Sequence, residues 1–341
     1  MALMGTGAFL LALADSLVAL AFGLLVMGLG QITNLVAGQT MIANRGPREG
    51  RELRFGWYAT VVSVGQLAGP AIGAVLAGGA AAAAIGARPS QVSAAAPELP
   101  VFVFSAVLSG VAFALALFLP HRRPRPVARD AGELPLGIVS ATVRVLRRPG
   151  MAAAMLVSIT VISSVDVLIA YLPAYGELNG LSVETIGALL SVRAASSLVS
   201  RLFMNKMIGL MGRQWVLATS MAMAGGGIVL LPIVNSEPAL FGTMILIGLG
   251  LGLGQPMTIA WVANRSPRSE RGLALGVRMT GNRASLLVVP TFMGALAGAG
   301  GLTAIWVALA ALLGFGAVVA RRTPFDELAA EGPHREPDGG G

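Results

Sequence analysis

One stretch of this chain occurs twice, and the repeat constrains the fold more than any other feature of the sequence. Residues 28–78 align without a gap on residues 248–298, at a constant shift of 220 positions. Each copy consists of an apolar segment, a short arginine-rich loop and a second apolar segment with a proline in its middle. The repeat therefore predicts two structurally related halves. Matching residues include Asn44 and Asn264, Arg51 and Arg271, Gly56 and Gly276, and Pro70 and Pro290.

The composition indicates a protein embedded in a membrane. The chain is 55% hydrophobic and 12% charged, with a mean hydropathy of +0.77, whereas soluble domains carry about 25% charged residues. Apolar runs of about 20 residues recur along the whole length, which predicts an all-α polytopic membrane protein. The net charge of +8 does not indicate a nucleic-acid partner, because the arginines cluster in short loops between apolar runs. The chain has no cysteine, which excludes disulfides and thiolate metal sites.

The apolar runs predict ten membrane spans in two lobes. We expect an N-terminal lobe over residues 1–120, a cytoplasmic linker over 121–150, a C-terminal lobe over 151–320 and a disordered cytoplasmic tail over 321–341. The first span is short for a bilayer that needs about 20 residues. The expected spans are residues 1–14, 17–42, 57–80, 101–119, 151–174, 183–205, 214–234, 238–262, 273–299 and 302–320.

The basic residues also predict the orientation. Loops on one side contain nearly all of the basic residues outside the spans, whereas the opposite loops contain only Arg88. The positive-inside rule then places both termini in the cytoplasm, for a multi-pass protein of the inner (cell) membrane. Trp57, Trp215 and Trp261 lie at the cytoplasmic ends of spans, where we expect them to anchor the helices at the membrane interface. Arg201 is expected to snorkel towards the same face.

With these features the chain resembles the major facilitator superfamily of secondary transporters. The resemblance covers roughly residues 1–320 and rests on the repeat, the long central loop, and the similar loops 44–54 and 264–271. The segment Gly65-x-x-x-Gly69-Pro70-x-x-Gly73 is similar to the family's fifth-helix motif, best known from drug/proton antiporters. The family fold has twelve helices in two six-helix halves, so the resemblance implies a 4 + 6 arrangement without the first two helices. One interpretation of this gap is a start codon placed too late; the other is a genuinely shortened protein.

The resemblance implies a secondary active transporter that moves a small solute by alternating access, with the substrate held near mid-membrane. A proton is the candidate coupling ion, although the loop Gly212-Arg213 lacks the family's acidic residue, which argues against the usual antiporter coupling. The alternatives are a multidrug efflux protein like the drug/proton antiporters and a truncated homologue that does not transport. Without an HExxH or ATP-binding motif, we expect no enzyme activity and no cofactor. We expect a monomer whose partners are the small-molecule substrate and the lipid bilayer.

Charged residues inside the spans indicate where substrate binds. Asp166 is the carboxylate placed well inside a span, and Arg193, Asn282 and Arg283 lie near the middle of theirs, with Arg278 one turn nearer the cytoplasm. A charge at mid-membrane costs at least about 2.5–3.5 kcal/mol, so such residues normally face a cavity or a partner. The arginines predict an anion-binding wall for an anionic or zwitterionic solute, with Asp166 as a coupling or gating group. In the structural alternative, Arg193 pairs with Asp166, and Arg278 pairs with a loop that this chain lacks.

Uncharged polar residues are less specific. Asn34 recurs with Gln31 and Gln39 along the second span. These side chains either face the cavity as hydrogen-bond partners or join helices to one another.

Small residues and prolines indicate where helices bend. Gly65, Gly69 and Gly73 are four residues apart, so they share one helix face on which backbones can approach closely. Pro70 and Pro290 each lack a backbone N–H and free a carbonyl one turn earlier. One interpretation is that these helices bend or slide during transport; the other is that the glycines serve tight packing alone.

Overall fold

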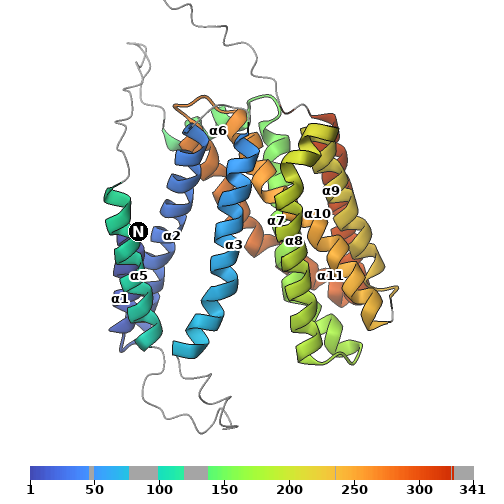
Figure 1. Cartoon of the computed structure of the whole chain (residues 1–341), viewed down its shortest axis with the longest axis horizontal. Helices are drawn as coiled ribbons and strands as arrows, with labels where there is room; N and C mark the ends of the chain where they lie inside the picture. The colour runs from blue at the N-terminus through green and yellow to red at the C-terminus, as the bar shows by residue number, and fades with distance from the viewer. Residues whose placement is uncertain (46–49, 77–98, 119–136, 235, 324, 326–341) are drawn as a thin grey trace, which may run out of the picture. The chain divides into compact units, whose positions relative to one another are not determined.

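The computed structural model describes residues 1–45, 50–76, 99–118, 137–234, 236–323 and 325, and the described chain is helical with no strand (Figure 1). The expectation of an all-α fold is therefore confirmed. The helices are α1 (Ala2–Ala12), α2 (Leu17–Asn44), α3 (Arg51–Leu76), α5 (Leu99–Leu117), α6 (Ile138–Leu146), α7 (Met151–Leu178), α8 (Val183–Met211), α9 (Arg213–Leu230), α10 (Glu237–Asn264) and α11 (Arg271–Arg322).

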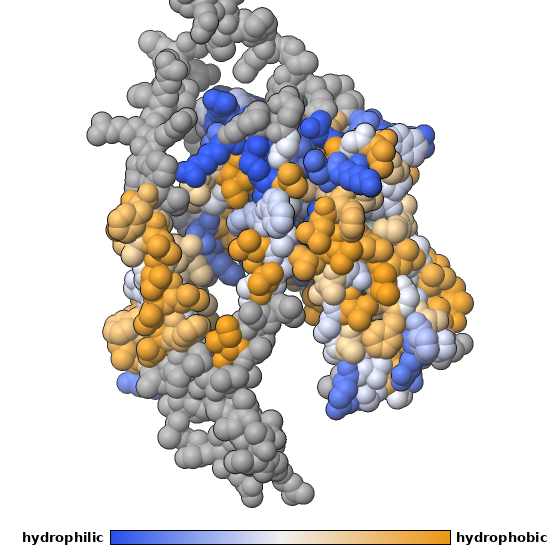
Figure 2. Space-filling view, viewed as in Figure 1, coloured by the Kyte–Doolittle hydropathy of each residue, from blue (hydrophilic) through white to orange (hydrophobic). Residues whose placement is uncertain are grey.

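Five of these helices, α2, α7, α8, α10 and α11, are long and apolar enough to cross a membrane. A helix of 28 residues, such as α7 or α10, is about 42 Å long at 1.5 Å per residue, which exceeds the hydrocarbon thickness of about 30 Å. The remaining expected spans fall on α1, α3, α5 and α9, and α11 carries two of them. Figure 2 shows one flank of the C-terminal helices. The surface of this flank is largely apolar and has hydrophilic residues at both ends.

Helix α11 contains a sharp break at the position where the sequence separates two spans. Gly300 has φ −138° and ψ 15°, and Gly301 has φ 67° and ψ −172°, so neither residue is helical. A positive φ suits glycine because it has no Cβ to clash. The 52 residues of α11 therefore form two helices on either side of this pair. At Pro290, by contrast, φ and ψ stay helical, and its carbonyl oxygen accepts a hydrogen bond of 3.1 Å from the Tyr171 hydroxyl.

The chain divides into two compact units. Unit 1 comprises Met1–Gly38 and Val61–Gly132, and unit 2 comprises Gln39–Thr60 and Glu133–Gly341. The last residues of α2 and the first residues of α3 thus belong to unit 2. In unit 1, α1 packs on α5, and a Cβ added to Gly7 of α1 would lie under 3.0 Å from the backbone of Met27 in α2. The lobe boundaries expected at residues 120 and 150 stay a prediction.

Within unit 2, α10 is the most enclosed helix, and alternating glycines allow its neighbours to approach. A Cβ added to Gly248 or Gly252 would lie under 3.0 Å from backbone atoms of α8. One added to Gly250 would meet the backbone of α9, and one added to Gly254 would meet a side chain of α7. Three helices therefore approach α10 at distances that only glycine permits.

Helix α11 extends slightly beyond the expected last span: it continues to Arg322, and Phe325 is buried. The disorder expected over the tail 321–341 stays a prediction for the residues beyond these. Phe325 stacks on Trp261 with ring centroids 4.4 Å apart, and Trp261 is fully buried instead of anchoring the helix at the interface. Trp57 and Trp215 are exposed. Residues 326–341 lie outside the described part of the chain.

The segment expected as a polar linker contains a helix. Helix α6 has only nine residues and lies at the end of unit 2 where α7 begins (Figure 1). It packs on α11 and α7. Val145 of this helix is fully buried and joins the hydrophobic core of unit 2.

Candidate functional site

Three charged residues of unit 2 lie deep within long helices. Measured along the helix axes at 1.5 Å per residue, Asp166 is about 22 Å from the start of α7, and Arg283 is about 18 Å from the start of α11. Arg193 is about 27 Å from the end of α8. The start of α7, the start of α11 and the end of α8 all lie on the side to which the sequence assigns the cytoplasm. The three charges therefore lie several turns inside their helices.

Asp166 and Arg283 are oppositely charged and lie close enough to interact. Asp166 is half-buried and Arg283 is exposed, and Arg283 is close enough to interact electrostatically with the carboxylate. Within the described residues no ion pair of 4.0 Å or less joins them, so neither charge is locked by the other. The alternative pairing of Asp166 with Arg193 is not seen in the described part of the chain, where no hydrogen bond or ion pair connects the two.

Arg278 and Asn282 lie one turn apart on α11 and are both buried. The Asn282 Oδ1 atom accepts a hydrogen bond of 3.2 Å from Ser158 of α7. Arg278 makes a long hydrogen bond of 3.4 Å to the Thr258 hydroxyl and interacts electrostatically with Tyr58. Over the described residues, no carboxylate lies within 4.0 Å of Arg278, and its Nε atom has no hydrogen-bond partner.

Helical geometry explains why the expected site residues on α11 separate into two groups. Each residue rotates by about 100° around the helix, so Arg283 cannot share the face of its neighbour Asn282. Asn282 and Arg278 face the interior of unit 2, whereas the Arg283 side chain is exposed. The structure thus brings together Asp166 and Arg283 in one place and Arg278, Asn282 and Ser158 in another.

Arg193 and Arg201 lie two turns apart on α8. Arg193 is half-buried, and its Nε atom has no hydrogen-bond partner in the described part of the structure. Arg201 does not snorkel, contrary to the expectation from its sequence position. Its Nε donates to the carbonyl of Gly252 and its Nη1 to the carbonyl of Ala59, each at 3.0 Å. Arg201 therefore ties α8 to α10 and to the start of α3.

The remaining expected residues belong to unit 1. Asn34 is half-buried in α2. Gly65 is exposed, and a Cβ added to it would meet no atom within 4 Å, so no close backbone approach occurs there. Gly69, Pro70 and Gly73 lie on the helical backbone of α3, and their surroundings are outside the described residues.

The structure contains a reciprocal contact between the two copies of the repeat that was not predicted from the sequence. Arg51, the first residue of α3, donates from Nη1 to Oδ1 of Asn264, the last residue of α10. Arg271, the first residue of α11, donates from Nη1 to Oδ1 of Asn44, the last residue of α2, at 2.9 Å. Both arginines and both asparagines match across the shift of 220 residues. The matched positions of the repeat carry the signal for this contact, and membrane topology alone does not explain these arginines.

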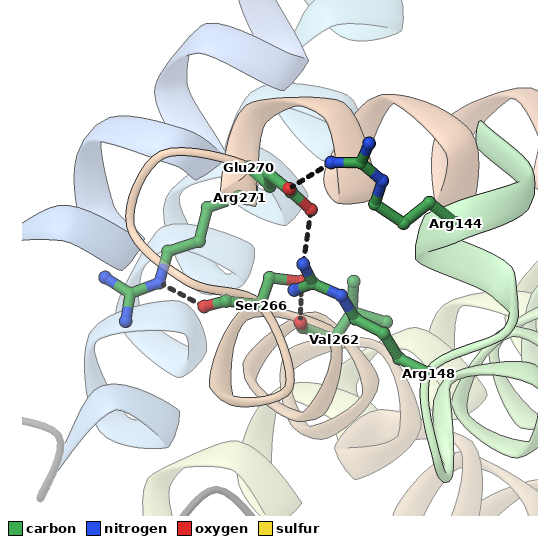
Figure 3. A network of polar contacts seen from close by, with 6 residues as sticks. All are labelled: Arg144, Arg148, Val262, Ser266, Glu270 and Arg271. Atoms are coloured by element: carbon green, nitrogen blue, oxygen red, sulfur yellow. Dashed lines mark hydrogen bonds and ion pairs between the residues drawn. The ribbon is translucent and has the colours of Figure 1, made fainter. Parts of the chain in front are cut away.

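Ion pairs surround this reciprocal contact. Glu52 is buried beside Arg51, and its carboxylate lies 2.7 Å from Nε of Arg213, at the start of α9. Glu270 lies 2.5 Å from Arg148 and 4.0 Å from Arg144, while Arg271 bonds to the Ser266 carbonyl at 3.2 Å (Figure 3). We call Asn44, Arg51, Glu52, Arg213, Asn264 and Arg271 the loop cluster.

Comparison with known proteins agrees with this architecture. The family model described as Major Facilitator Superfamily matches residues 1–182 and 164–338. The class G tetracycline resistance protein of Vibrio anguillarum is 28% identical over 307 residues, which are 88% of this chain and 70% of that protein. The crystal structure of the E. coli fucose:proton symporter has a TM-score of 0.75 at 16% identity, covering 94% of this chain and 81% of that one. That of a human organic anion transporter has a TM-score of 0.73 at 16% identity, covering 93% and 74%.

Proposed function

Because the chain belongs to the major facilitator superfamily, we propose that it is a secondary active transporter for a small anionic or zwitterionic solute. The proposed mechanism is alternating access across the inner membrane, with both termini in the cytoplasm. Arg283 and Arg193 bind the anionic group, and Asp166 acts as the coupling or gating carboxylate.

The observation that carries this proposal is the exposure of Arg283 deep within its helix. Its guanidinium is exposed about 18 Å along α11 from the helix start, and a charge at that depth is costly when it faces lipid. An exposed arginine in mid-membrane is therefore best accommodated by water or a bound anion. A guanidinium presents two parallel N–H donors that match a carboxylate or phosphate group.

Asp166 provides a means to regulate that anion site. Its carboxylate attracts Arg283 without forming a close ion pair, so a substrate anion competes with Asp166 for the same guanidinium. Protonation of Asp166 removes this competition and frees Arg283 for the substrate. Proton binding and substrate binding would then favour each other, which is the linkage that a proton symporter requires.

Tetracycline efflux is the second candidate, favoured by the 28% identity to the tetracycline resistance protein. On this alternative the substrate moves outward, and the glycines and proline of α3 belong to an antiporter's moving helix. Expression in a tetracycline-sensitive host distinguishes the two: efflux lowers tetracycline accumulation, whereas transport of an unrelated anion leaves it unchanged.

The decisive experiment measures binding first and transport second. Purified protein is screened by thermal shift against carboxylates, phosphate esters, amino acids, sugars and tetracycline, and the stabilising compounds are tested for uptake into proteoliposomes. We expect Arg283→Ala to abolish stabilisation by an anionic hit and Arg283→Lys to weaken it. Arg268→Ala removes an exposed loop arginine and serves as the matched control. Equal binding and uptake of every hit by the Arg283 and control variants would refute the proposed anion site.

A further inference from the structure

Helix α6 has an apolar face that no other part of the described chain covers. Val139 is 73% exposed, Val143 is 41% exposed and Leu146 is 38% exposed. These residues are spaced by four and three positions, so they form one stripe along the helix. Val145, on another side, is fully buried in unit 2. The helix is therefore fixed to unit 2 by one side and presents a second apolar side outward.

Arginines flank this outward stripe. At about 100° per residue, Ser140, Arg144 and Arg147 lie on the face next to Val143. They line a groove of about 430 Å³ together with Val143, Arg148 and Pro149. One wall of the groove is thus apolar and the other is cationic.

The positive charge of this groove is only partly neutralised. Glu270 forms ion pairs with Arg144 at 4.0 Å and with Arg148 at 2.5 Å (Figure 3). Arg147 is exposed, and no carboxylate of the described residues lies within 4.0 Å of it. Among the described residues, Glu270 is the carboxylate within 4.0 Å of these guanidinium groups, so Arg147 leaves a positive charge at the groove.

We infer that this groove binds the phosphate headgroup of an anionic phospholipid. The phosphate lies between Arg147 and Arg144, and an acyl chain lies along Val139, Val143 and Leu146. The location supports a lipid, because α7 begins at Met151, a few residues after α6, and enters the membrane there. Basic residues beside a membrane helix or on an amphipathic helix attract anionic lipids. A soluble anion would use the guanidinium groups but not the exposed apolar stripe.

The test uses native mass spectrometry of the purified, full-length protein titrated with phosphatidylglycerol, phosphatidylcholine or inorganic phosphate. Arg147→Gln removes the groove arginine that has no carboxylate partner among the described residues. The fold should therefore tolerate this substitution. Val143→Ser removes part of the apolar stripe. Arg322→Gln removes an exposed arginine at the end of α11 and is the matched control. Unfolding temperatures of all variants without lipid verify that they fold equally well.

We expect wild type and Arg322→Gln to bind phosphatidylglycerol more tightly than phosphatidylcholine. Arg147→Gln should weaken phosphatidylglycerol binding roughly fivefold, the factor that corresponds to about 1 kcal/mol per basic residue near a membrane surface. Val143→Ser should weaken both lipids. Three results would each overturn the inference: equal affinity for the two lipids, equal losses in Arg147→Gln and Arg322→Gln, or full competition by inorganic phosphate with no effect of Val143→Ser.

Discussion

The reciprocal contact in the loop cluster makes a quantitative prediction. Arg51 is buried and bonds to the side chain of Asn264, so Arg51→Ala and Asn264→Ala each remove a charged hydrogen bond. Such bonds contribute about 1.5–3 kcal/mol net. Taking about 2 kcal/mol, Asn264→Ala should raise the population with an open loop cluster about thirtyfold, and Arg51→Ala at least as much. Because the Arg51–Asn264 bond is lost in both single variants, the double variant should open much less than the product of the two single effects, which would be at least about nine-hundredfold.

The chain is suited to a direct measurement of this opening because it has no native cysteine. Ala43 is fully buried next to Asn44, so Ala43→Cys places a single thiol that a maleimide reaches only when the cluster opens. The labelling rate follows the open population when closing is faster than labelling. Rates are compared for the single, double and control variants, with Arg322→Ala as the control.

Loss of the matching contact between Arg271 and Asn44 should have a smaller effect on the labelling rate. Asn44 is exposed, and Arg271 also donates to the carbonyls of Ala263 and Ser266, at 3.1 and 3.2 Å. Asn44→Ala should therefore raise the labelling rate only a few-fold, since exposed hydrogen bonds contribute about 0.5–1.5 kcal/mol. The reasoning is refuted if Arg51→Ala labels at the control rate, or if Arg51→Ala and Asn264→Ala multiply in the double variant.

Three further predictions concern packing. Gly252→Val should lower the unfolding temperature, because overpacking costs about 1–3 kcal/mol. The control Gly242→Ala, on the same helix, adds a Cβ that meets no atom within 4 Å and should leave the unfolding temperature unchanged. Equal effects of the two substitutions would contradict the packing account. Phe325→Ala removes the ring stacked on Trp261 and should lower the free energy of unfolding by about 3–5 kcal/mol. Thermal unfolding measures the loss of stability, and tryptophan fluorescence reports the changed surroundings of Trp261. An unchanged fluorescence spectrum would count against the stack. Arg201→Gln loses bonds to two backbone carbonyls and should destabilise purified protein by about 1–3 kcal/mol, a result that wild-type stability would exclude.

Helix positions could largely be predicted from the sequence, because apolar runs and polar gaps mark where a chain can cross a bilayer. The break between the expected spans 273–299 and 302–320 coincides with the non-helical Gly300 and Gly301. Helix α6 was missed because a nine-residue amphipathic helix in an arginine-rich segment has too few apolar residues to stand out. Length and composition therefore locate spans better than they locate interfacial helices.

The depth of the charged residues could also be predicted, but not their partners. Hydropathy places Arg278, Asn282 and Arg283 in one span, yet only tertiary packing decides which face of α11 is buried. The same limit explains Trp261 and Arg201. Both residues lie near a polar loop in the sequence. In the fold, Phe325 covers Trp261, and carbonyl groups of neighbouring helices bind Arg201.

The glycines of α10 have a practical consequence for spectroscopy. Close backbone approach to α8 and α9, and a tight side-chain contact with α7, leave α10 no room to rotate or translate against these three helices. Spin labels placed on α8 and α10 should therefore report a fixed separation throughout a transport cycle. Such a label pair is an internal ruler, and any distance that changes relative to it originates outside this four-helix block.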